Sequence, residues 1–62
     1  MDISELISSM EEDFISLVES DLSDSTFLTS AKLIIGDDWR EVGRGIISDE
    51  APHLMKKFEA RL

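Results

Sequence analysis

The chain has 62 residues and no cysteine, and its 14 Asp and Glu residues against six Lys and Arg give a net charge of −8. This length makes one domain (1–62) that buries only about 60% of its unfolded surface, so its stability is marginal. The lack of cysteine excludes disulfides and thiolate metal sites. No apolar run reaches the roughly 18 residues of a membrane span, and the N-terminus is acidic where a signal peptide is basic. We therefore expect a cytoplasmic protein, nuclear if the host is a eukaryote, that is not secreted and does not bind membranes.

Seven apolar side chains in the first third of the chain recur at helical spacing. They are Ile3, Leu6, Ile7, Met10, Phe14, Leu17 and Val18. At about 100° per residue they share an arc of roughly 120°, the width of a core-facing helix surface. Asp2 suits the N-cap, and Glu5 completes the pattern of a capping box. The pattern predicts an amphipathic helix over about 2–21, whose apolar stripe the rest of the chain or a second copy must cover.

The same segment carries all of the net charge. Residues 1–25 contain eight acids and no Lys or Arg. Glu5, Glu12 and Glu19 are seven residues apart and form a row on the side of the helix away from the apolar stripe. Such a one-sided surface attracts a basic partner and repels nucleic acid or an anionic membrane. The alternative is a solvated face that only keeps the chain soluble.

A second helix is predicted over 24–35, with Ser23 or Asp24 as its cap and Gly36 as a left-handed stop. Its apolar face consists of Phe27, Leu28, Ala31, Ile34 and Ile35. Ile15 and Leu33 lie off the main apolar faces, which indicates either a second packing surface or a contact with a partner.

A third helix is predicted over 38–46, because Asp38 and Glu41 repeat the capping pattern. Trp39, Val42 and Ile46 share one of its sides. The two glycines at positions 43 and 45 each weaken a helix by about 1 kcal/mol relative to Ala, so we expect a short helix. The single Trp is expected to anchor the core, with a partner-facing hot spot as the alternative.

A last helix is predicted over 49–61, with Ser48 as its cap and Pro52 tolerated in its first turn. Its apolar face consists of Ala51, Leu54, Met55, Phe58 and Leu62. Lys56, Lys57 and Arg61 make this end basic. They are expected to pair with the acidic first helix, within a monomer or across a dimer.

Together the four segments (2–21, 24–35, 38–46 and 49–61) predict an all-α fold, a small bundle of three to four helices, as a monomer or a homodimer. The predicted core consists of Ile3, Leu6, Ile7, Met10, Phe14, Leu17, Val18, Phe27, Ala31, Ile34, Trp39, Val42, Ile46, Leu54, Met55 and Phe58.

The sequence offers little material for catalysis or for metal binding. His53 is the only histidine, and Glu50 is its only near acid, which is too few ligands for a metal cluster. The segment 21–32 begins like a calcium loop, but it has Thr26 where an EF-hand needs Gly and Lys32 where it needs Glu. The serines fall at caps or on polar helix faces, and no Gly-rich phosphate loop follows a strand. We expect no catalytic residue, no cofactor and no metal, and the chain is not expected to be an enzyme.

Three short resemblances suggest other functions. Residues 26–47 can be aligned with a helix-turn-helix in which Arg40 and Arg44 contact phosphates, although two basic residues on so acidic a chain are few for binding DNA. The segment 34–46 (IIGDDWREVGRGI) resembles the Trp-containing second-to-third helix stretch of death-fold adaptor domains over about a fifth of this chain, which is shorter than domains of that family. Residues 15–18, followed by ESDLSDS, resemble a SUMO-interacting motif. That motif binds as an added strand, which conflicts with the helical stripe.

Two main functions remain. The first is a small regulator or inhibitor that docks its acidic helix on a basic surface of a partner protein, as a mimic of nucleic acid. In size and charge it is similar to compact acidic proteins that phages and viruses make against host enzymes. The alternative is a structural or adaptor module that homodimerises through apolar helix faces. A DNA-binding helix-turn-helix is a minor alternative. The partner-binding residues predicted for the first function are Glu5, Glu11, Glu12, Asp13, Ile15, Glu19 and Leu33.

Overall fold

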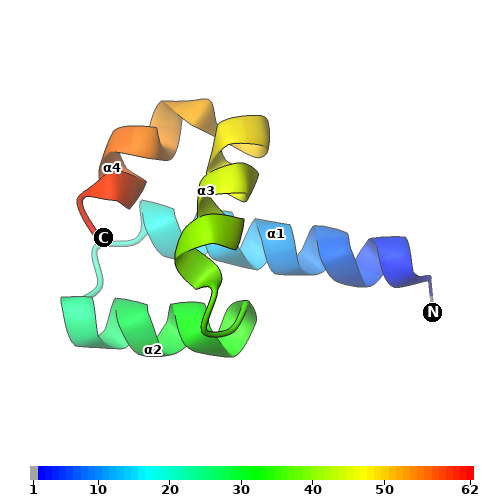
Figure 1. The fold of residues 1–62 in the computed structure, drawn as a ribbon, viewed down its shortest axis with the longest axis horizontal. Coiled ribbons are helices and arrows are strands. Elements are labelled where there is room, and N and C mark those ends of the chain that lie inside the picture. Colours follow the sequence, from blue (N-terminus) through cyan, green and yellow to red (C-terminus); the bar gives the residue numbers. More distant parts are fainter. Residues whose placement is uncertain (1) are drawn as a thin grey trace.

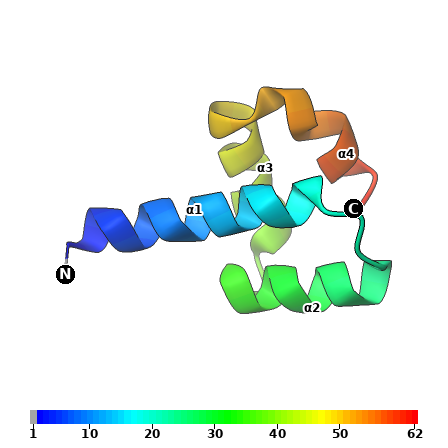
Figure 2. The ribbon, with the colours of Figure 1, turned by 180° about the vertical axis from the view of Figure 1, so that it is seen from behind.

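The computed structural model describes residues 2–62, which form four α-helices and one short 3-10 turn. The elements are α1 (Ile3–Glu19), α2 (Asp24–Ile34), α3 (Trp39–Glu50), η1 (Pro52–Leu54) and α4 (Met55–Glu59). No strand occurs in this part of the chain. α2 runs back alongside α1, α3 crosses this pair, and η1 and α4 return the chain to the C-terminal end of α1 (Figures 1 and 2). The prediction of an all-α bundle is confirmed.

The N-caps predicted for α1 and α2 and the stop predicted after α2 act where expected. Asp2 Oδ1 accepts a hydrogen bond of 3.1 Å from the backbone N–H of Ser4, and thus caps α1. Ser23 Oγ accepts one of 3.4 Å from the N–H of Thr26 at the start of α2. Gly36, just beyond α2, has a φ of +133°, which L side chains rarely adopt.

The boundary between the last two predicted helices is wrong. α3 does not end at residue 46 but continues to Glu50, so Ser48 lies inside it and caps nothing. The break comes at Ala51, whose φ of −146° and ψ of 59° are not helical. Pro52 explains this position, because a proline disfavours helical backbone at the preceding residue and has no N–H for an earlier carbonyl. The predicted cap of α3 is also wrong in detail, since the side chain of Asp38 makes no capping hydrogen bond.

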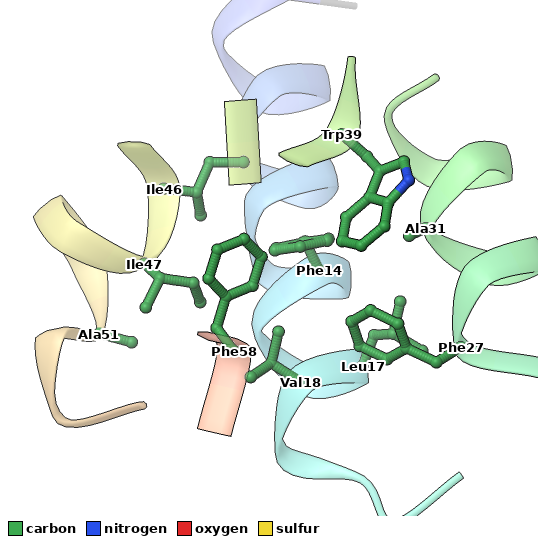
Figure 3. Packing of buried hydrophobic residues seen from close by; sticks show 10 residues of the cluster. All are labelled: Phe14, Leu17, Val18, Phe27, Ala31, Trp39, Ile46, Ile47, Ala51 and Phe58. Carbon is green, nitrogen blue, oxygen red and sulfur yellow. The ribbon is translucent and has the colours of Figure 1, made fainter. Parts of the chain in front are cut away.

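One aromatic side chain from each helix meets at the centre of the molecule (Figure 3). Phe14 of α1 contacts Phe27 of α2 and Phe58 of α4, with ring centroids 6.5 and 5.8 Å apart. Trp39 of α3 closes the ring of contacts, with centroids 5.6 Å from Phe27 and 6.3 Å from Phe58. All four pairs meet edge to face, a favourable arrangement for aromatic rings. These are all the aromatic residues of the chain, so the prediction that Trp39 anchors the core is confirmed.

Most of the predicted core lies in or against this cluster. The buried members are Phe14, Leu17, Val18, Phe27, Ala31, Trp39, Ile46 and Phe58, and half-buried around them are Met10, Ile34, Val42, Leu54 and Met55. Ile47 is also fully buried, although it was not predicted, because the extension of α3 brings it against the core.

Three predicted core residues are exposed instead. Ile3, Leu6 and Ile7 expose 72%, 53% and 52% of their surface. The reason is length: at 1.5 Å per residue, the 17 residues of α1 extend about 26 Å, and the 11 residues of α2 beside it only about 17 Å. The start of α1 therefore projects beyond the helices that pack on the rest of it (Figures 1 and 2).

Candidate protein-binding surface

The N-terminal half of α1, defined here as residues 2–13, is the most exposed helical segment of the molecule. Residues 2–9 are all exposed, and Met10 is the first apolar side chain of the stripe that packs against the core. We call the exposed residues Ile3, Leu6 and Ile7 the tip stripe. It continues the line of Phe14 and the buried residues after it. The same helix face is therefore buried in the core at one end and exposed to solvent at the other.

The pairing expected between the basic C-terminal segment and the acidic first helix occurs only at the end of that helix and in the residues that follow it. Lys57 Nζ lies 3.4 Å from Asp21 Oδ1 and donates a hydrogen bond of 2.8 Å to the backbone carbonyl of Glu19. Arg61 Nη1 lies 2.8 Å from Asp24 Oδ1. These contacts neutralise the turn between α1 and α2 and tie α4 to it.

No such pairing reaches the N-terminal half of α1. Among residues 2–62, no Lys or Arg forms an ion pair with any of its five carboxylates, which are those of Asp2, Glu5, Glu11, Glu12 and Asp13. The third ion pair of this part of the chain joins Arg44 and Glu59 at 3.8 Å, on α3 and α4. Segment 2–13 therefore holds five acidic side chains and no cation of its own.

The carboxylates of α1 lie on different sides of the helix. Glu5 and Glu12, with Glu19 beyond them, point about 180° away from the apolar stripe, whereas Glu11 and Asp13 flank it at about 80° on either side. Glu11 is half-buried, and the others are exposed.

The structure does not gather all the predicted contact residues into one surface. Ile15 is half-buried and packs against the core. Leu33 is 83% exposed, but it lies on the side of α2 opposite Phe27 and Ala31. Ile3, Leu6 and Ile7 were missed as contact residues because their spacing matches that of core residues.

The SUMO-like reading of residues 15–18 is wrong in this fold. These residues lie within α1, and Leu17 and Val18 are buried. Binding as an added strand would require unwinding the helix and removing both side chains from the core.

The outer face of α3 is the other surface with a distinct shape. It forms an open hollow of about 530 Å³ lined by Arg40, Glu41, Arg44, Gly45, Ser48 and Leu62. Both arginines are engaged by their own chain, since Arg40 lies 4.7 Å from the centroid of the Trp39 ring and Arg44 pairs with Glu59. Every aromatic ring is buried, so none is exposed to stack on a base. This surface is poorly suited to phosphates or bases.

The described residues offer no assembled reactive group. His53 is exposed, no buried polar or charged residue occurs in the described chain, and no group of three His, Asp or Glu residues there is placed to hold a metal ion. Within the same residues, no helix is long and apolar enough to cross a membrane.

Compared with known proteins, the chain matches no family profile, no curated protein and no solved structure.

Proposed function

We propose that this protein is a small regulator or inhibitor that binds a basic surface of another protein through the N-terminal half of α1. The observation that supports the proposal is the set of carboxylates in residues 2–13 that no Lys or Arg of the described chain pairs with. Two of the six basic residues, Lys57 and Arg61, contact the other end of α1 and the turn after it instead.

Such a surface attracts a cationic partner over a distance of about a Debye length and fixes its orientation on contact. A partner whose basic surface normally holds nucleic acid would be blocked, because carboxylates would occupy the place of phosphates. Docking of this kind needs no catalytic group on the chain.

The test compares the wild type with E5Q/E11Q/E12Q/D13N, in which four exposed or half-buried carboxylates become neutral amides of similar shape. Both proteins are immobilised, incubated with extract of the native host, and the captured proteins are quantified by mass spectrometry. We expect basic proteins that the wild type captures and the variant does not. For each, affinity should fall about tenfold or more between roughly 50 and 200 mM salt, because several ion pairs form.

The matched control is D37N/E41Q/D49N/E50Q, which removes the same amount of charge from exposed positions at the start and end of α3. It should capture the same proteins as the wild type. Equal capture by wild type and E5Q/E11Q/E12Q/D13N would contradict the proposal, and so would equal losses in both variants, which would indicate a dependence on net charge alone.

A second candidate function is a structural or adaptor module that homodimerises, with acids that only keep it soluble. The observation that favours it is the exposed tip stripe, because bare apolar surface is often covered by a second copy. Light scattering that shows a salt-insensitive dimer would support this alternative.

A further inference from the structure

Building on the proposed function, we propose that the tip stripe is the contact itself, and that its occupant is an amphipathic helix of the partner protein with Lys or Arg along the edges of its apolar face. The carboxylates that meet this helix are then Glu11 and Asp13, and not the row on the back of α1.

The first argument is the position of the apolar residues. Ile3, Leu6 and Ile7 follow the i, i+3, i+4 spacing by which helices pack on helices. The other large apolar residues that are exposed in the described chain, Leu22 and Leu33 among them, stand singly on different elements. Three adjacent exposed side chains on a helix that projects from the molecule form a surface that a second helix can lie along.

The second argument is charge. A helix laid along the tip stripe, with one end toward the core, would bring its edges near Glu11 and Asp13, which flank the same face of α1 between one and two turns beyond Ile7. Neither carboxylate is paired within the described chain. Cations at both edges of the partner helix could therefore pair with these carboxylates without breaking an ion pair of the described chain.

Charge also distinguishes this occupant from a second copy. Two α1 helices packed on their tip stripes would bring ten carboxylates and no cation together, since each carries five in residues 2–13. Like charges at close range cost free energy, and three apolar side chains from each copy offer little contact area to offset that repulsion. Charge thus favours a basic partner helix over a homodimer.

The experiment uses two synthetic helical peptides with the same apolar face. One consists of two LKKLLKL heptads, and the other of two LEELLEL heptads. Each carries a fluorescent label, and binding to the 62-residue chain is followed by fluorescence anisotropy at low salt. We expect the lysine peptide to bind and the glutamate peptide to bind at least about tenfold more weakly.

Variants of the chain then locate the contact. I3S/L6S/I7S removes the stripe and keeps every charge, E11Q/D13N removes the flanking carboxylates, and E5Q/E12Q removes the same charge from the back of the helix. We expect the first two to weaken binding of the lysine peptide about tenfold or more, and E5Q/E12Q to change it less than about threefold. L22S/L33S/L62S, which removes three exposed leucines elsewhere, serves as the control for lost apolar surface and should bind like the wild type. The emission of the buried Trp39 verifies the fold of each variant.

The outcomes separate this inference from the function on which it rests. Loss of binding in E5Q/E12Q with full binding in I3S/L6S/I7S would overturn the inference and leave an acidic docking surface standing. Equal binding of both peptides would overturn the charge argument for both proposals. A dimer that disappears in I3S/L6S/I7S, or binding of zwitterionic lipid vesicles in competition with the lysine peptide, would assign the stripe to another occupant and overturn the inference.

Discussion

At the scale of single residues, the two glycines of α3 have opposite surroundings. A Cβ added to Gly43 would lie 2.6 Å from Phe14 Cζ and 3.2 Å from Phe58 Cε1, whereas one added to Gly45 would meet nothing within 4 Å. Gly43 is what allows α3 to cross close over the aromatic cluster. A loss of helix propensity at that position is therefore offset by packing, which explains why α3 is longer than the glycines suggest.

This contrast predicts that G43A destabilises the protein and G45A stabilises it. For G43A, overpacking against fully buried rings costs about 1–3 kcal/mol and exceeds the helical gain of about 1 kcal/mol from Ala. For G45A only the gain remains, about 0.5–1 kcal/mol. Thermal unfolding followed by circular dichroism should give a lower midpoint for G43A and a higher midpoint for G45A than for the wild type. Each kcal/mol should shift the midpoint by about 4–8 °C. A stabilised G43A would mean that α3 does not pack on Phe14 as described.

At the scale of elements, α4 depends on tertiary contacts. Its five residues are too few for a helix that is stable alone. Phe58 inserts into the core, and Lys57 Nζ reaches the last carbonyl of α1, where a cation suits the helix dipole. Arg61 Cζ lies 4.9 Å from the centroid of Phe27, and its side chain is only 14% exposed. α4 thus closes the bundle over the turn between α1 and α2.

We predict that R61A costs about 1–2 kcal/mol. The cation–π contact with Phe27 contributes about 0.5–1 kcal/mol, and the ion pair with the largely exposed Asp24 contributes less than about 1 kcal/mol. The change can be measured by urea unfolding followed through Trp39 fluorescence. K56A, at an exposed position of α4, is the control and should stay within about 0.5 kcal/mol of the wild type. Equal stabilities of R61A and K56A would show that Arg61 does not hold α4.

At the scale of the whole molecule, the net charge predicts that repulsion between carboxylates outweighs the attraction within ion pairs. The chain has a net charge of −8, and the described residues form three ion pairs, all with partly or largely exposed partners. Such pairs contribute little, whereas self-repulsion destabilises a folded state of high net charge. Salt screens both the repulsion and the ion pairs. The larger of the two therefore decides whether added salt raises or lowers the stability of the fold.

We therefore predict that raising salt from about 20 to 200 mM stabilises the protein, by a few degrees in its thermal midpoint. E5Q/E11Q/E12Q/D13N, which removes unpaired carboxylates only, should be more stable than the wild type at low salt and respond less to added salt. A midpoint that falls as salt rises would show that the ion pairs of Lys57 and Arg61 dominate instead.

The local features of this protein follow from its sequence, because their causes are local. Helical periodicity identified the apolar face of α1, Asp2 and Ser23 marked the starts of α1 and α2, and Gly36 marked the end of α2. The number of helices and most of the core followed as well. Pro52 could have located the break after α3, since the restriction it imposes on Ala51 is also local.

The tertiary structure decided which parts of each face are covered. Periodicity shows which side of a helix is apolar, but it does not show whether a neighbour is long enough to cover that side, and α2 is too short to reach Ile3, Leu6 and Ile7. Composition likewise shows more acids than bases, but it does not show that Lys57 and Arg61 form their ion pairs at the turn after α1. The exposed stripe and its unpaired carboxylates arise from the relative lengths and packing of whole helices, and these are settled only when the chain is folded.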